Sequence, residues 1–311
     1  MKTKMTAGGM LFFKLLESRI RHFKDLGKEK TASNYSCAMK HFTRFRNGED
    51  MEIADLTVNL MKDFQAYLVG RGLKMNTVSL YNRMLKAAYN YALDEEILQT
   101  DKRPFRKVFT GREKTRKRTL DKKALKKLVR ADLSVDRRLE FARDMFLFSI
   151  YMQGMAFVDI ARLTKSQVRS GYVVYQRSKT NQHLRIAIQP CAKEIIEKWM
   201  VRDPECPYLF PILYNPDKKK EVRYDSALRT HNRRLNKIAD DLDLGGTLSS
   251  YVSRHTWASL AKWSGIRDTI ISEAMGHNNI ETTSIYLASL NTEVIASANR
   301  KVLSELMKWR I

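Results

Sequence analysis

Apolar residues recur at helical spacing in four stretches before residue 100, and glycine or polar residues separate each stretch from the next. The four stripes cover residues 11–26, 35–45, 57–70 and 76–89. The third stripe begins near Thr57, and the fourth has Asn76 or Thr77 in the position of an N-cap, where a short polar side chain can bond a free backbone amide. These stripes predict a small helical domain over residues 8–100.

Residues 120–311 are also mostly helical in pattern, with one break. Residues 120–133 form an amphipathic stripe, and residues 141–163 are almost all apolar, which predicts a pair of buried helices. Residues 171–190 instead alternate apolar and polar side chains around a Ser-Lys-Thr-Asn turn, which predicts a β-hairpin. Helices are expected to resume after the hairpin and to continue to Ile311. The predicted fold is therefore mainly α with a small β-hairpin, in an α+β second domain.

The stretch between these two patterns, residues 101–119, is predicted to be a basic linker. Residues 101–120 hold nine basic and two acidic side chains, and so carry +7 of the chain's formal net charge of +23. A proline, a glycine and the lack of periodicity indicate an extended segment. Such a run is often only a solvated spacer. Because this one lies between two folded parts of a basic protein, we favour an extended segment that is held against phosphates.

The composition of the chain indicates which kinds of molecule the protein binds. The pI is about 9.9 and 43% of the residues are hydrophobic, so this is a folded basic protein rather than a disordered basic tail. Such proteins most often bind a polyanion, with nucleic acid the first choice and an anionic membrane surface the second. We find no signal peptide and no membrane span, and we expect a cytoplasmic, nucleoid-associated protein. Three widely spaced cysteines suggest neither a disulfide framework nor a zinc site.

The sequence offers no convincing metal or nucleotide site. Its dense acidic cluster, residues 240–246, resembles part of a calcium loop, but Val252 stands where a bidentate glutamate would be required. No glycine-rich phosphate loop ending in Gly-Lys-Ser or Gly-Lys-Thr is present. We therefore predict that the protein needs no cofactor and no metal.

A different group of residues occurs in the last third of the chain. Tyr251, Arg254 and His255 stand in SYVSRHTWASLA, and His277 and Tyr286 follow in EAMGHNNIETTSIYLAS. Singly, each has an ordinary structural explanation, because a lone tyrosine is usually a core or rim residue and a histidine after glycine commonly caps a turn. Jointly, an arginine to neutralise a phosphoryl group, a histidine to donate to it and a tyrosine to attack it form a metal-free set.

These motifs resemble the signature of tyrosine site-specific recombinases, the phage integrase family. The resemblance rests on R-H-T-W-A followed by M-G-H-x₈-Y, and on Lys179 in R-S-K-T, which fits the family's catalytic lysine. It extends over almost the whole chain. It implies that residues 8–100 are a SAM-like core-binding domain and that residues 120–311 are the catalytic domain.

The resemblance also implies a role for each residue. Tyr286 would attack the scissile phosphate to give a 3′-phosphotyrosine, and Arg254 would bind the non-bridging oxygens. Lys179 would protonate the leaving 5′-oxygen, and His277 would donate a hydrogen bond to the phosphoryl group. Tyr251 stands where the family usually has a histidine; a phenol can still donate a hydrogen bond but is a poor base near neutrality.

The second departure concerns the first catalytic arginine of the family. Ala156 occupies its slot in QGMAFVDIARL, a stretch that resembles integrases of Bacteroides-type mobile elements. Arg143, on the preceding predicted helix, is a candidate for the missing cation, and Arg162 is a weaker one. The alternative for Arg143 is an ordinary pairing with Asp144 or another acid on a helix.

The same resemblance predicts the partner. We expect double-stranded DNA with inverted-repeat core sites, clamped by both domains, and a homo-tetramer on DNA formed from free monomers. Lysines and arginines would contact phosphates, and polar residues of the fourth predicted helix would reach base edges. The predicted contacts are Lys74, Asn76, Thr77, Asn82, Lys86, Arg103, Arg106 and Lys107.

The chain leaves no room for an extra N-terminal arm-binding domain, which favours a simple invertase or resolvase over an integrase that needs arm sites. Inversion, excision and integration all remain open. Two other classes also remain: a DNA-binding regulator that has lost catalysis, and a type IB topoisomerase or telomere resolvase.

Overall fold

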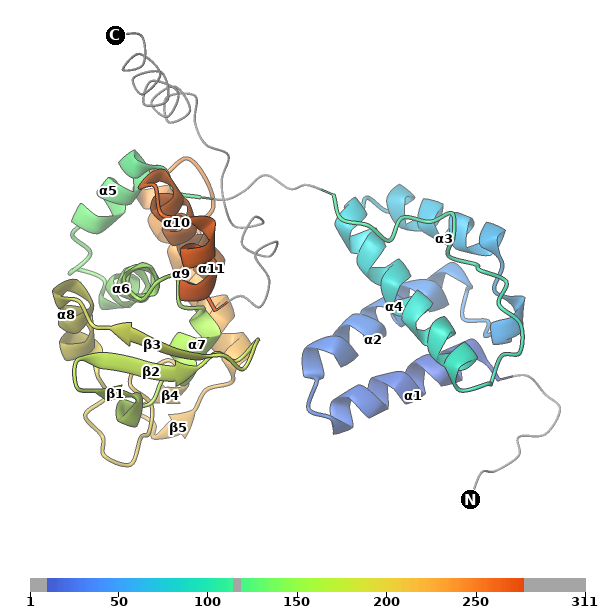
Figure 1. Cartoon of the computed structure of the whole chain (residues 1–311), viewed down its shortest axis with the longest axis horizontal. Coiled ribbons are helices and arrows are strands. Elements are labelled where there is room, and N and C mark those ends of the chain that lie inside the picture. The colour runs from blue at the N-terminus through green and yellow to red at the C-terminus, as the bar shows by residue number, and fades with distance from the viewer. Residues whose placement is uncertain (1–9, 114–118, 277–311) are drawn as a thin grey trace, which may run out of the picture. The chain divides into compact units, whose positions relative to one another are not determined.

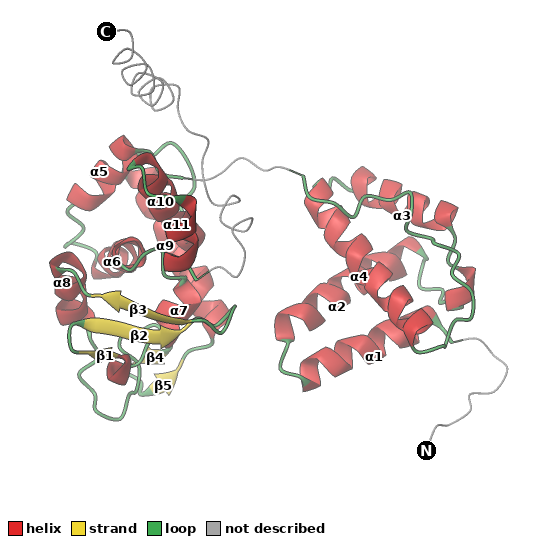
Figure 2. Cartoon of the chain, viewed as in Figure 1, coloured by secondary structure: helices red, strands yellow, loops and turns green. Residues whose placement is uncertain are grey.

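The computed structural model of this protein describes residues 10–113 and 119–276, and the chain divides into two units between residues 115 and 116 (Figure 1). Each unit has its own apolar core. Figure 2 shows helices in both units but, among the described residues, strands only in the second. The mainly helical fold with a small sheet that the sequence predicts is confirmed.

The described residues of the first unit form four α-helices and one short 3₁₀ turn. They are α1 (Phe12–Asp25), α2 (Glu29–Phe45), η1 (Ile53–Asp55), α3 (Val58–Gly70) and α4 (Met75–Asp94). Each of the four predicted apolar stripes forms one helix, and the rings of Phe12 and Phe64 meet that of Phe42 at 5.5 and 5.0 Å, edge to face. This aromatic packing contributes to the core that holds the helices together.

The structure confirms the predicted N-cap of α3 and contradicts that of α4. The hydroxyl of Thr57 accepts a hydrogen bond from the backbone amide of Leu60, so α3 begins as predicted. The prediction for α4 is wrong, because this helix begins at Met75 and its N-cap is Lys74, which makes no side-chain cap. Asn76 therefore lies inside the first turn, where its side chain is available for other contacts.

Residues 101–113, the larger part of the predicted linker, pack on the helices of the first unit. Phe105 is buried and its ring lies 6.0 Å from that of Tyr89 on α4. The Tyr89 hydroxyl accepts a hydrogen bond from the amide of Lys102 at 3.0 Å. This segment is thus part of the first folded unit, and the residues after it, 114–118, lie outside the described part of the chain.

In the second unit, several helices pack around α6 (Arg137–Tyr151). The helices of this unit are α5 (Lys122–Arg130), α6, α7 (Phe157–Arg162), η2 (Lys165–Gln167), α8 (Pro190–Trp199), α9 (Tyr224–Asp241), α10 (Ser250–Trp263) and α11 (Asp268–Ala274). Helix α6 packs against α8, α9 and α10. The apolar run over residues 141–163 divides into α6 and α7 at Gln153 and Gly154, which both have positive φ angles. The predicted buried helix pair is confirmed.

The predicted hairpin is also confirmed, within a three-stranded antiparallel sheet of β1 (Val168–Arg169), β2 (Tyr172–Gln176) and β3 (His183–Ala187). The prediction of uninterrupted helix after the hairpin is wrong for residues 200–223. These residues form loops and a small two-stranded sheet, β4 (Tyr214–Asn215) with β5 (Lys220–Glu221). Four prolines between residues 204 and 216 explain the break, since proline cannot donate the helical hydrogen bond.

Candidate functional site: a buried arginine beside an anchored lysine turn

The turn between β2 and β3 places Lys179 at its exposed tip. The turn is closed by backbone hydrogen bonds between Arg177 and residues 181 and 182. Asp159 of α7, buried in the domain, accepts a hydrogen bond from the backbone amide of Ser178 at 2.9 Å. The carboxylate therefore fixes the base of the turn while the lysine ammonium remains in solvent, where it can reach a ligand.

Arg254 is buried on α10, with 3% of its surface exposed. Its Nη1 donates to the carbonyl of Gly154 and its Nη2 to that of Met275, each at 2.6 Å. Gly154 has a φ of +72°, and a β-carbon on it would come within 3.3 Å of the Cα and Cγ atoms of Arg254. A glycine is needed here both for the left-handed backbone and for the close approach.

Tyr251 lies one turn before Arg254 on the same helix, so the two residues lie on neighbouring parts of its surface. Its side chain is 52% exposed, and its ring meets that of His255 edge to face at 4.8 Å. An exposed phenol beside a buried guanidinium is accessible to a bound ligand, and the role of Tyr251 stays a prediction.

The segment that follows α11 is held from two sides. Arg254 bonds the carbonyl of Met275, and from the hairpin Arg177 Nη1 and the Thr180 hydroxyl both donate to the carbonyl of Gly276. The next residue in the sequence is His277. His277 and Tyr286 lie outside the described residues, so their positions stay predictions. The structure does bring Arg254 and the Lys179 turn to the residues immediately before them.

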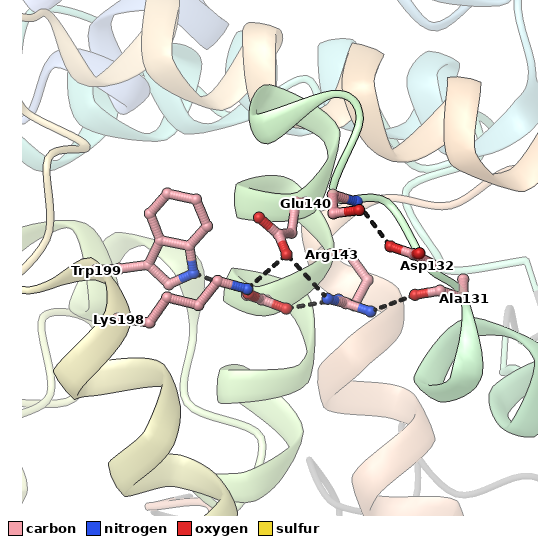
Figure 3. Close-up of polar contacts among 8 residues, drawn as sticks. Ala131, Asp132, Glu140, Arg143, Lys198 and Trp199 are labelled. Carbon is pink, nitrogen blue, oxygen red and sulfur yellow. Dashed lines mark hydrogen bonds and ion pairs between the residues drawn. The ribbon is translucent and has the colours of Figure 1, made fainter.

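Arg143 belongs to a different, charged network on α6 and α8 (Figure 3). Its Nε donates to Asp144 at 2.5 Å and its Nη1 to the carbonyl of Ala131 at 2.8 Å. Lys198 bonds Glu140 and Asp144 at 2.6 and 3.0 Å. Burial alone would lower the pKa of Lys198, but its hydrogen bonds to the two carboxylates raise it. The geometry favours the alternative interpretation, in which Arg143 pairs with Asp144 rather than with a phosphate.

The loop in which the family's first arginine is expected runs from Gln153 to Ala156. Ala156 is the half-buried N-cap of α7, and its methyl group brings no charge to the site. The described residues contain another buried guanidinium that the motif analysis did not single out, Arg177, two positions before Lys179. The sequence signal for Arg177 was its position two residues before Lys179, near the end of a strand. A single sequence does not distinguish this spacing from that of an exposed basic turn.

The five basic residues predicted to contact phosphates are all exposed on the first unit. They are Lys74, Lys86, Arg103, Arg106 and Lys107. Three of them, Lys86, Arg103 and Arg106, line one pocket of about 300 Å³ that also includes Tyr89 and Phe105. Because Tyr89 and Phe105 are almost fully buried, the accessible charge at this pocket comes mainly from the three basic side chains, with Asp101 beside them.

The polar residues of α4 bond the segment that follows the helix. Asn82 is fully buried, and its Nδ2 donates to the carbonyl of Phe109 at 3.1 Å. Asn76 accepts from the amide of Glu113 at 2.8 Å and donates to its carbonyl at 3.0 Å. These contacts commit the Asn82 amide to the fold, whereas Asn76 and the half-buried Thr77 retain partial exposure and stay predicted base contacts.

No helix in the described part of the chain is long and apolar enough to cross a bilayer. Within residues 10–113 and 119–276, no three histidine, cysteine or acidic side chains are grouped so that they could hold a metal ion.

Both units match known families. Residues 11–108 match the phage integrase SAM-like domain, and residues 118–293 match the phage integrase family. A comparison with curated proteins finds no match.

Solved structures share the fold at low sequence identity. A lambda integrase dimer bound to a COC′ core site has a TM-score of 0.69 and 17% identity, over 89% of this chain and 95% of that one. The Tn1549 transposon integrase in complex with a circular intermediate DNA has a TM-score of 0.70 and 15% identity, over 94% and 100%. A lambda integrase tetramer bound to a Holliday junction has a TM-score of 0.68 and 17% identity, over 91% and 79%.

Proposed function

Because this chain belongs to the phage integrase family, whose members are tyrosine site-specific recombinases, we propose that it cuts and rejoins duplex DNA through a 3′-phosphotyrosine on Tyr286. The observation that carries the proposal is the convergence of buried Arg254 and the anchored Lys179 turn on the residues just before His277. These are the groups that a metal-free attack on a phosphodiester requires.

In the proposed cleavage step, the Tyr286 oxygen attacks phosphorus in line and the bond from phosphorus to the 5′-oxygen breaks. The phenol gives its proton to solvent, the leaving oxygen gains one from Lys179, and solvent reprotonates the lysine, so no proton is consumed overall. Arg254 binds the non-bridging oxygens as their charge grows, and His277 and Tyr251 add hydrogen bonds. The phosphotyrosine keeps the energy of the broken bond, so another strand's 5′-hydroxyl can reverse the step without ATP.

We further propose that four copies act on DNA with inverted-repeat core sites, and that the reaction inverts, excises or integrates a segment. Two observations support this assembly. The structural relatives include a lambda integrase tetramer bound to a Holliday junction, and the first unit carries an exposed basic surface around the pocket of Lys86, Arg103 and Arg106. Basic residues on such a surface would position the duplex through its phosphates.

The test is trapping of the covalent intermediate. A pool of duplexes with inverted repeats and a nick beside the scissile position lets the short 5′ fragment diffuse away, so the adduct accumulates. We expect a denaturation-resistant adduct with the unaltered protein and none with Tyr286→Phe. Arg254→Met should lower the rate about 100-fold or more, the scale for loss of one charge-stabilising donor.

The other outcomes identify the alternatives. Sequence-specific binding with no adduct from the unaltered protein would contradict the proposal and identify a DNA-binding regulator. An adduct followed by relaxation of supercoils, or by hairpin closure of ends without exchange between two sites, would identify a type IB topoisomerase or telomere resolvase instead.

A further inference from the structure

A second buried guanidinium lies beside the proposed site. Arg177, directly after β2, has 3% of its surface exposed, the same fraction as Arg254. It approaches from the hairpin, whereas Arg254 approaches from α10. The two arginines donate to the carbonyls of adjacent residues, Gly276 and Met275. Two elements far apart in the sequence thus bring their guanidiniums to one short stretch of backbone.

The pKa of a buried phenol, Tyr175, depends on the same charges. Burial raises the pKa of Tyr175, the Asp159 carboxylate raises it further, and the Arg254 and Arg177 guanidiniums act against both effects. Because Tyr175 is itself in the core, the three charged groups interact with it through a poorly screened interior. Arg177 and Arg254 bond adjacent carbonyls, and Asp159 bonds the residue after Arg177, so the three charged groups form one cluster.

The hydrogen bonds that Arg177 makes to described residues do not neutralise its charge. They go to neutral oxygens, the Gly276 carbonyl and the Thr180 hydroxyl. Its Nε is buried and has no hydrogen-bond partner among the residues the structure describes. The neighbouring carboxylate, Asp159, is bonded to the amide of Ser178. A buried cation of this kind is costly unless an anion binds beside it.

We propose that Arg177 supplies the second guanidinium for the scissile phosphate, in place of the family arginine that is missing at Ala156. The inference rests on the proposed recombinase activity and adds a residue to it. Arg177 keeps Nη1 on Gly276 and directs its remaining N–H groups, Nε among them, to a non-bridging oxygen. Arg254 binds the phosphate beside it, so two positive charges meet the charge that develops as Tyr286 attacks.

Arg177 fits this role better than the arginine suggested by the sequence. Arg143 is already paired with Asp144 and bonded to Ala131. Arg177 has no ion pair to a described carboxylate, and it shares its turn with Lys179, the proposed general acid. One hairpin therefore brings both the proton donor and a charge-neutralising group to the phosphate.

The test compares a charged with an uncharged scissile group. Nicked duplexes carry either the natural phosphodiester or a methylphosphonate, in which a methyl group replaces one charged oxygen. We expect Arg177→Met to slow formation of the Tyr286 adduct about 100-fold on the phosphodiester, and less than about 5-fold on the methylphosphonate, because the neutral group has less charge to stabilise. Arg177→Lys should recover part of the loss.

Controls separate this role from a structural one. Arg169→Met removes an exposed arginine from the same sheet and should match the unaltered protein on both substrates. Thermal unfolding and gel-shift binding show whether each variant is folded and binds DNA. An equal loss on both substrates, or full activity of Arg177→Met on the phosphodiester, would overturn the proposal. Failure of the unaltered protein to form an adduct on either substrate would instead overturn the recombinase function itself.

Discussion

At the scale of single residues, half-buried Arg143 and buried Arg254 show that two arginines of one domain can be held by different kinds of partner. Arg143 is surrounded by carboxylates, and Asp144 also accepts from Trp199 Nε1 at 2.8 Å, so its charge is neutralised within the domain. The described bonds of Arg254 go to backbone carbonyls. Pairing with carboxylates fixes Arg143 on α6, whereas the described bonds of Arg254 fix it to the backbone beside the Lys179 turn.

A buried histidine makes the second unit sensitive to acid. His231 on α9 stacks on Phe157 with 4.2 Å between the ring centroids. Burial, with a smaller contribution from Arg234, lowers its pKa to about 3. The unfolded chain, with an ordinary histidine pKa near 6.5, takes up a proton that the folded unit does not. Stability should therefore fall by about 1.4 kcal/mol per pH unit as the pH drops from about 6 to 4.

The measurement is denaturant unfolding followed by tryptophan fluorescence, since all four tryptophans lie after residue 115. His231→Phe keeps an aromatic ring that can stack on Phe157 and removes the titrating group. Its free energy of unfolding should vary less with pH over the same range. Parallel profiles for the variant and the unaltered protein would show that other groups cause the acid sensitivity.

At the scale of elements, α4 holds residues 101–113 through asparagine side chains. Gln65 on α3 takes part, because its Oε1 accepts from the amide of Phe109 at 2.6 Å and from Asn82 at 3.3 Å. The basic segment is thereby fixed to the helices that also carry Lys74 and Lys86. Arg103 and Arg106 of this segment line one pocket with Lys86 of α4.

Loss of the buried amide should destabilise this arrangement. Asn82→Ala leaves the Phe109 carbonyl without its side-chain donor and should lower the free energy of unfolding of the first unit by about 1 to 3 kcal/mol. Asn90→Ala, at an exposed position on the same helix, is the matched control and should change it by less than about 0.5 kcal/mol. Circular dichroism during thermal unfolding measures both. Unchanged stability with altered sequence preference for DNA would assign Asn82 to base contacts after all.

These elements also show what a sequence can and cannot predict. The stripes of α1 to α4 and the alternation of β2 and β3 follow from local periodicity, so these elements were predicted correctly. The bonds from Asn76 and Asn82 to residues 109–113 join positions 27 to 37 residues apart, and no local pattern encodes them. Arg254 was predicted because a motif surrounds it, whereas Arg177 is identified only by its burial and its partners.

At the scale of the whole molecule, the net charge of +23 predicts strong, salt-dependent attraction to DNA. Replacing Arg103, Arg106 and Lys107 together with glutamine should lower affinity. It should also reduce the slope of log K against log salt by about 3, since each lost phosphate contact removes about 0.9. Titrations of a fluorescent duplex at several salt concentrations measure the slope.

The control removes the same charge from the second unit. Lys218 and Lys219, between β4 and β5, and Lys220, the first residue of β5, are all exposed, and their replacement with glutamine should leave the slope nearly unchanged. Equal reductions from the two triple variants would mean that net charge alone, rather than the surface of the first unit, determines binding.

The contact between Gly154 and Arg254 bears on how this site can change in evolution. The side chain of Ala156 carries no charge and does not hold Arg254, because the guanidinium is bonded to the backbone carbonyl of Gly154. A methyl group on Gly154 would press on Arg254 at 3.3 Å and strain a left-handed backbone. Two positions in one turn thus differ in mutational freedom, because Gly154 is restricted by its contact with Arg254 and the side chain of Ala156 takes no part in that contact.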